Sequence, residues 1–128
     1  MTQTGQRTFE TGAVRDLSIG KGRMDLLPWQ AIIEVSKHSE RGAAHYGENN
    51  VRKGIPFSSL ADSAARHFAK WISGIDDEPY HLEAACWNLL WLLEETITHP
   101  ELNNIPAVQE AWREAERYNE WAEERGIE

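Results

Sequence analysis

The segment His81-Leu-Glu-Ala-Ala-Cys-Trp-Asn88-Leu-Leu-Trp-Leu-Leu93 decides the fold, because it is apolar on nearly every side of a helix. A helix that is hydrophobic all round lies in the middle of a fold. At helical spacing His81, Ala84, Ala85 and Asn88 share one face, so two small residues separate two polar side chains. This face predicts either a ligand cavity or a close crossing with another helix.

Length and charge indicate one acidic domain. The chain has 128 residues, which we expect to form a single domain over 1–128. It carries 13 Lys and Arg against 21 Asp and Glu, a formal net charge of -8, and the basic residues form no long run. This balance argues against nucleic acid as the main partner, and an anionic substrate would need the help of a metal ion.

Cysteine content and hydropathy bear on the compartment. Cys86 is the one cysteine, so no intramolecular disulfide can form and a reducing compartment is expected. The first residues contain no apolar signal core, and Asn88 interrupts the longest apolar run, which argues against a membrane segment. We therefore expect a cytoplasmic protein.

Residues 1–27 predict an N-terminal arm that contains glycine, arginine and lysine. Gly12, Gly20 and Gly22 interrupt any helical period. Lys21 and Arg23 could contact a phosphate, since the glycines beside them let the backbone approach an anion. The spacing is not that of a Walker loop, and a flexible tail is the alternative.

A first helix is expected over residues 29–46, after Pro28. Its apolar stripe includes Glu40, and a carboxylate on a buried stripe must be paired, protonated or bound to a metal. A salt bridge to Arg66 is the structural alternative. The neighbouring polar strip, most simply a solvated face, consists of Glu34, His38, Arg41 and His45.

A loop over 47–57 precedes a second helix, which Ser58 or Ser59 can cap and Gly74 ends. Asp62 and Arg66 are i,i+4 neighbours on that helix. His67 is rotated about 140° from Asp62, so the two cannot be assumed to share a ligand. A lone histidine here is more often hydrogen-bonded than metal-bound.

Three acids precede the central helix, in the segment Asp76-Asp77-Glu78-Pro79. Acids and a proline favour a helix N-terminus, and capping explains one or two of them. Three carboxylates just before His81 are also suited to a hard cation such as Mg²⁺.

The last segment, 105–126, predicts an amphipathic helix that covers the core or contacts another subunit. The six tryptophans fall in segments that read as helical, and we expect most in the core or in subunit contacts, with one or two facing a ligand. They are Trp29, Trp71, Trp87, Trp91, Trp112 and Trp121.

These motifs together resemble the phage-encoded dATP/dGTP diphosphohydrolase family, the MazZ-type relatives of the MazG-like all-α nucleotide pyrophosphohydrolases. The resemblance runs from about residue 9 to 95 in a fixed order and leaves out the last helix. It is carried by Phe9–Asp16, Gly20–Pro28, Glu40–Gly47, Asn50, Lys53-Gly54, Asp62–His67, Gly74 and His81–Asn88.

The resemblance implies a MazG-like, all-α, oligomeric bundle of about four helices behind the N-terminal arm. It implies hydrolysis of a purine deoxynucleoside triphosphate, dGTP or dATP, to the monophosphate and pyrophosphate with Mg²⁺ or Mn²⁺. The homo-oligomer would be a dimer or tetramer. In phages with 2-aminoadenine genomes such an enzyme supplies dGMP to the modified-base pathway.

Site residues carried over by position are acids, cations and amides from all parts of the match. Glu40, Asp62 and Asp77 or Glu78 would hold metal, and His81 would be a ligand, a water-orienting group or a partner of a ligand. The catalytic set is thus Glu40, Asp62 and His81. The substrate would contact Lys21, Arg23, Asn50, Lys53, Arg66, His67 and Asn88, with Asn88 bonding either the base or sugar or a neighbouring backbone.

Two departures from the family pattern stand out. Val51 follows the loop asparagine where members usually have tryptophan. The MazG-like Glu-x-x-Glu and Glu-x-x-Asp pattern is absent from the expected helices, and its nearest literal match, Glu120 and Glu123, lies on the last helix.

Two other classes of function stay open at this point. One is a phosphohydrolase of the HD type, which would release nucleoside and triphosphate or inorganic phosphate, although the chain has no His-Asp dipeptide. The other is a non-catalytic helical module that acts through its acidic surface and tryptophans.

Overall fold

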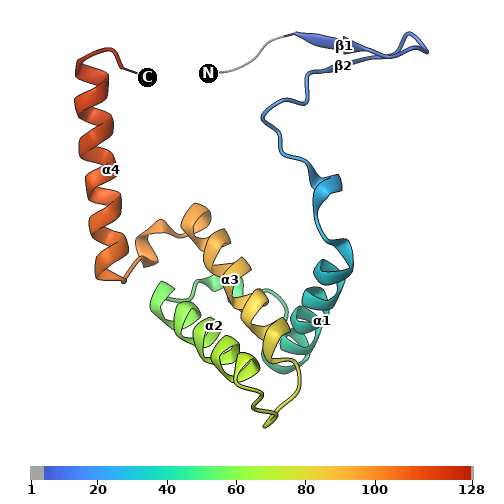
Figure 1. Cartoon of the computed structure of the whole chain (residues 1–128), viewed down its shortest axis with the longest axis vertical. Helices are drawn as coiled ribbons and strands as arrows, with labels where there is room; N and C mark the ends of the chain where they lie inside the picture. Colours follow the sequence, from blue (N-terminus) through green and yellow to red (C-terminus); the bar gives the residue numbers. More distant parts are fainter. Residues whose placement is uncertain (1–4, 128) are drawn as a thin grey trace.

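Four helices and a small hairpin make up the computed structural model, which describes residues 5–127 (Figure 1). This confirms the all-helical class and the number of helices. Strands β1 (Gln6–Thr8) and β2 (Val14–Asp16) precede helices α1 (Trp29–Tyr46), α2 (Phe57–Ile72), α3 (His81–Thr98) and α4 (Pro106–Glu124), with short 3-10 turns η1 (Met24–Leu26), η2 (Val51–Lys53) and η3 (Pro100–Leu102) between them.

The structure describes the N-terminal arm from residue 5 onward, and its first four residues lie outside the described part of the chain. The strands β1 and β2 pair antiparallel, with Arg7 opposite Arg15. The sequence predicted no strand here. Each strand has only three residues and all of them are exposed, so the alternation of apolar and polar residues that marks a half-buried strand is missing.

The core lies between α2 and α3, which run side by side and are joined by the loop 73–80 (Figure 1). Helix α2 buries Phe57, Leu60 and Ala64, and α3 buries Ala84 and Ala85. The face that carries the small pair is therefore a close helix crossing. Small residues allow that approach because the two backbones can come near without side-chain clashes.

Asn88 lies on the same buried face and bonds to its own helix. Its side-chain Nδ2 donates to the Ala84 carbonyl at 2.8 Å. Of the two expectations for this amide, a backbone partner or the substrate, the structure provides the backbone partner.

Helix α1 packs on α3 through one narrow face and has no fully buried residue. The half-buried positions include Val35, His38 and Gly42. Glu40 is exposed, since it lies two residues, about 200° of helix rotation, from His38. The expectation of Glu40 on a buried stripe is therefore wrong.

The ends of the helices differ slightly from expectation. Ser58 and Ser59 lie inside α2, which begins after Pro56, and Asn104 bonds the backbone N–H and hydroxyl of Ser58 at 2.9 and 2.8 Å. The acids before α3 lie in the loop, because Tyr80, with a φ of 71°, precedes the first helical residue.

Helix α4 projects away from the other three helices (Figure 1). Its Trp112 packs edge-on against Phe57 with ring centroids 5.9 Å apart. Ala122 is its one buried residue, held under the C-terminal turn where the Ile127 N–H donates to its carbonyl. Within one chain α4 therefore does not cover the core.

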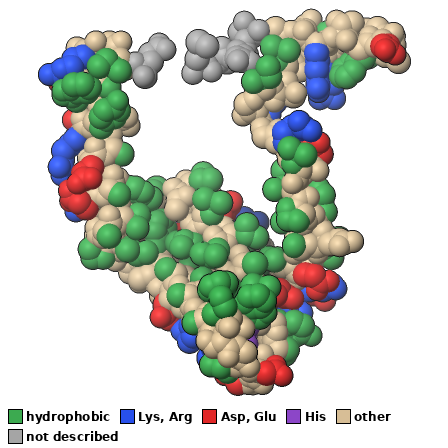
Figure 2. Space-filling model, viewed as in Figure 1, with side chains coloured by type: hydrophobic (Ala, Val, Ile, Leu, Met, Phe, Trp, Pro, Cys, Tyr) green, Lys and Arg blue, Asp and Glu red, His purple; other side chains and the backbone are tan. Residues whose placement is uncertain are grey.

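Large apolar side chains remain exposed on the outer face of α3, and hydrophobic surface is prominent in the space-filling view (Figure 2). Leu82, Leu89, Leu93 and Ile97 follow one another at helical spacing and are 40, 55, 61 and 74% exposed. A contiguous apolar stripe of this kind is typical of a surface that another chain covers.

Among the helices of residues 5–127, none combines the length and apolar character that crossing a membrane requires.

Candidate metal centre

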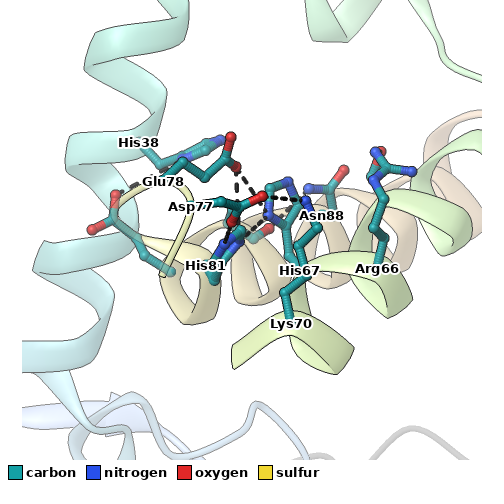
Figure 3. A network of polar contacts seen from close by, with 11 residues as sticks. His38, Arg66, His67, Lys70, Asp77, Glu78, His81 and Asn88 are labelled. Atoms are coloured by element: carbon teal, nitrogen blue, oxygen red, sulfur yellow. Dashed lines mark hydrogen bonds and ion pairs between the residues drawn. The ribbon is translucent and has the colours of Figure 1, made fainter. Parts of the chain in front are cut away.

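The loop 73–80 returns over the first turn of α3 and brings two acids to His81 (Figure 3). Asp77 Oδ1 lies 2.6 Å from Nε2 of His81, and Asp77 Oδ2 accepts a hydrogen bond from Lys70 at 2.7 Å. His81 is 5% exposed. This acid and Lys70 therefore fix the ring of a buried histidine in one orientation.

A second histidine faces His81 from α2. The two Nδ1 atoms of His67 and His81 are 2.9 Å apart, and Oε1 of Glu78 lies 3.5 and 3.7 Å from them (Figure 3). Three potential ligand atoms thus face one another within 4.8 Å. Sequence reasoning named these three residues separately, whereas the fold brings them together.

The donor set suits a divalent transition metal. Two ligands at about 2.1 Å and at right angles around one ion are roughly 3.0 Å apart, close to the His67–His81 distance. Two imidazoles and one carboxylate also form a common set for such ions. With Asp77 bonded to Nε2, Nδ1 of neutral His81 carries no proton and accepts the hydrogen bond of 2.9 Å from Nδ1 of His67. His67 would have to release that proton when an ion binds.

The electrostatics of this cluster favour its metal-binding state at neutral pH. Burial lowers the pKa of His67 from its ordinary value, against an opposing effect of Glu78, so its ring is neutral at pH 7. The Lys70 ammonium, and after it His81, lower the pKa of Asp77 to about 2. Asp77 therefore stays ionised.

The low pKa of Asp77 predicts a loss of stability in acid. Because this pKa is about 2 in the folded chain against an ordinary 3.8, the contacts of Asp77 stabilise the fold fully above 3.8 and progressively less as the pH falls toward 2. We expect Asp77→Asn to lose stability at neutral pH and to show a flatter acid dependence than wild type, as measured by urea unfolding at a series of pH values.

Asp76→Asn is the matched control. It removes the same charge from the neighbouring residue, whose side chain is exposed. It should keep the wild-type acid dependence. Equal acid profiles for Asp77→Asn and wild type would contradict the assigned contacts.

A second polar network lies beside the cluster and was missed from the sequence. Glu83 of α3 pairs with Arg41, and its Oε1 lies 3.8 Å from Nδ1 of His38. The Arg41 guanidinium also lies over the Tyr80 ring, 4.1 Å from its centroid. The expectation of a solvated strip is therefore wrong for His38 and Arg41, because both face α3.

One signal in the sequence could have found this network. Glu83 is the one carboxylate between Glu78 and Glu94, inside an otherwise apolar helix. An isolated acid in such a helix requires a cationic partner from a neighbouring element.

Glu95 is a further functional candidate that sequence reasoning missed. It is 1% exposed, and its Oε1 accepts a hydrogen bond from the Ile55 N–H at 2.6 Å. Its Oε2 has no hydrogen-bond partner among the described residues. This buried carboxylate fixes the end of the loop that connects α1 and α2.

The remaining predicted site residues lie outside the cluster. Asp62 and Arg66 pair with each other at 2.6 Å on the exposed face of α2, which confirms their i,i+4 contact and leaves Glu40 without Arg66 as a partner. Figure 3 shows Arg66 apart from the cluster. Lys53 is exposed and Asn50 half-buried in the connecting loop.

The cations of the N-terminal arm are also distant from the cluster. Arg23 forms a two-fold hydrogen bond with Asp25, both contacts at 2.8 Å, and Lys21 is exposed. The arm leaves α1 at the end opposite the α2–α3 loop (Figure 1).

These features define an all-helical domain in which a buried histidine, a half-buried histidine and exposed carboxylates form a cluster. The model of the family described as dATP/dGTP diphosphohydrolase, N-terminal, matches residues 11–105, and the chain belongs to this family. Its members are pyrophosphohydrolases, so the chain is an enzyme of that class. Comparisons with curated proteins and with solved structures gave no significant match.

The match includes α1, α2, α3 and the whole cluster. It ends at residue 105, one residue before α4 begins. The resemblance inferred from the motifs is therefore confirmed at the level of the family.

Proposed function

We propose that the chain hydrolyses dGTP or dATP to the monophosphate and pyrophosphate in a metal-dependent reaction at the His67–Glu78–His81 cluster. The observation that supports this most strongly is the convergence of three ligand atoms from two helices and a loop. The oxygen of a water molecule would bond to the α-phosphorus and release a proton to solvent, the bond between the α-phosphorus and the α–β bridging oxygen would break, and pyrophosphate would leave.

Each residue of the cluster has a separate role in this proposal. Nδ1 of His67, Nδ1 of His81 and a carboxylate oxygen of Glu78 hold the ion, Mn²⁺ or Mg²⁺. Asp77 holds His81 in the right tautomer, and Lys70 holds Asp77. When bound, the ion neutralises phosphate charge and activates water.

Cations near the cluster would position the triphosphate. Lys70 and Arg41 lie beside the cluster, although each is already paired with a carboxylate. Substrate phosphates would compete with Asp77 and Glu83 for them, since phosphate oxygens make strong charge-assisted hydrogen bonds. The overall charge of -8 makes such local cations necessary for an anionic substrate.

A homo-oligomer is part of the proposal. The exposed stripe of Leu82, Leu89, Leu93 and Ile97 on α3 supports it, because apolar surface of this kind is buried in subunit contacts. The arm that carries Lys21 and Arg23 joins α1 at the end opposite the α2–α3 loop (Figure 1), so these cations would reach substrate only in a neighbouring chain's site.

The biological setting is proposed from the family resemblance. In the cytoplasm of a host infected by a phage with a 2-aminoadenine genome, this reaction would supply dGMP for the modified base.

Product analysis tests the proposal. The purified chain is incubated with each of the four dNTPs and Mn²⁺ or Mg²⁺, and the products are separated by chromatography. Monophosphate and pyrophosphate from dGTP or dATP are expected. Release of nucleoside would indicate the HD-type reaction instead, and unchanged dNTPs under all conditions would indicate a non-catalytic module.

A further inference from the structure

A cavity of about 340 Å³ lies between the C-terminal half of α1, the connecting loop and the middle of α3. We propose that this cavity binds the purine base of the nucleotide. The inference rests on the proposed function and adds a base-binding subsite to the proposed metal centre. Its lining combines small residues, aromatic rings and loop amides, among them Gly42, Ala43, Tyr46, Asn50, Trp87 and Trp91.

Two tryptophans of α3 form the aromatic wall of the cavity. The ring of Trp87 is fixed, because its Nε1 donates to the Ser39 hydroxyl at 2.9 Å and His38 packs on it with ring centroids 5.0 Å apart. Trp91 follows one turn later, and the guanidinium of Arg52 lies 5.2 Å from its ring centroid. The guanidinium covers this face of Trp91, so a base that stacks there would take the place of Arg52.

The loop that forms the opposite wall is held in place at two points. The Ile55 N–H donates to buried Glu95 at 2.6 Å, and Nε2 of His99 lies 3.2 Å from the Arg52 carbonyl. Gly54 lies between these two points with a φ of 102°, a backbone conformation that favours glycine. The cavity is therefore formed before any ligand binds, which reduces the entropy cost of binding.

The size and polarity of the cavity fit one nucleobase. A volume of about 340 Å³ is near the lower end of the roughly 300–1,000 Å³ found for ligand pockets. It suits a base and part of its sugar. The Asn50 amide and the Glu48 carboxylate also line the cavity, so acceptors and a donor are available for the polar edge of a purine.

The position of the cavity relative to the metal centre fits a nucleotide. Trp87 lies six residues after His81 on α3, which is about 9 Å along the helix axis and about 240° around it, so His81 faces α2 and Trp87 faces α1. A nucleotide that reaches both regions must therefore pass along the side of α3 that faces α1. His38 links the two regions, because it packs on Trp87 and also lies beside Glu83 at the cluster end of α3.

Gly42→Leu is the sharpest test, since it fills the cavity without disturbing the fold. A Cβ at Gly42 meets no atom within 4 Å, and the residue is helical. Leucine is a better helix former than glycine, so the variant should melt at a temperature equal to or higher than wild type. Gly42→Ala, which leaves most of the cavity open, is the matched control.

Calorimetric titration with dGMP in the presence of EDTA measures base binding apart from metal and turnover. We expect Gly42→Leu to weaken dGMP binding about tenfold or more, Gly42→Ala to change it little, and wild type to bind dCMP about tenfold more weakly than dGMP. Trp91→Leu should weaken binding similarly. Trp71→Leu, which replaces an exposed tryptophan of α2 outside the cavity, should not.

Unchanged dGMP binding by a folded Gly42→Leu variant would overturn the proposal, as would equal binding of dCMP and dGMP by wild type. Absence of dNTP hydrolysis by wild type, with dGMP binding still sensitive to Gly42→Leu, would reject the proposed reaction and retain the base site.

Discussion

His81→Ala is expected to lower metal-dependent pyrophosphate release by about 100-fold or more while leaving the helical fold intact. The substitution removes the Nδ1 atom that lies 2.9 Å from His67, and it leaves Asp77 without its imidazole partner. Because His81 lies at the first turn of α3, its removal leaves the packing farther along the helix in place. Pyrophosphate release and thermal unfolding followed by circular dichroism measure the two properties separately.

Glu40→Gln is the matched comparison for His81→Ala. The sequence led us to expect Glu40 at the metal, whereas the structure places it on the exposed side of α1. If the cluster is the metal centre of a single chain, Glu40→Gln should retain most of the wild-type activity. Loss of activity in Glu40→Gln together with normal activity in His81→Ala would reject the cluster and favour a metal centre that includes Glu40.

Removal of the metal with a chelator is expected to stop hydrolysis, and Mn²⁺ should restore it at a concentration about tenfold or more below that of Mg²⁺. Imidazole nitrogens bind transition-metal ions more strongly than Mg²⁺, which prefers oxygen ligands. Two of the three donors in the cluster are imidazoles. The measurement is the half-activating concentration of each ion after dialysis against EDTA.

His67→Asp provides the control for this preference. Exchanging one imidazole for a carboxylate should move the half-activating concentrations of Mn²⁺ and Mg²⁺ closer together. Equal half-activating concentrations in the wild type would show that the histidines do not bind the ion.

The parts of the fold that the sequence predicted are those set by local pattern. The apolar character of residues 81–93 placed α3 in the centre, and the acids just before His81 were correctly associated with it. Asp77 lies four residues before His81, so their contact follows from local chain geometry.

The parts that the sequence could not predict depend on how helices face one another. Helix α1 is amphipathic on a broad stripe, and only the position of α3 determines that His38 turns inward and Glu40 outward. The pairing of His67 with His81 likewise joins residues 14 positions apart on two helices. Periodicity defines a face of a helix, but it does not define the partner of that face.

Helix α3 carries the proposed metal ligand His81, the aromatic wall of the cavity (Trp87 and Trp91) and the loop anchor Glu95 in one rigid element. Each added or deleted residue in a helix rotates everything beyond it by about 100°. An insertion between His81 and Glu95 would therefore turn the later groups away from the earlier ones. In evolution, the length of this segment should be more constrained than its composition, and length variation should be confined to the loops before and after it.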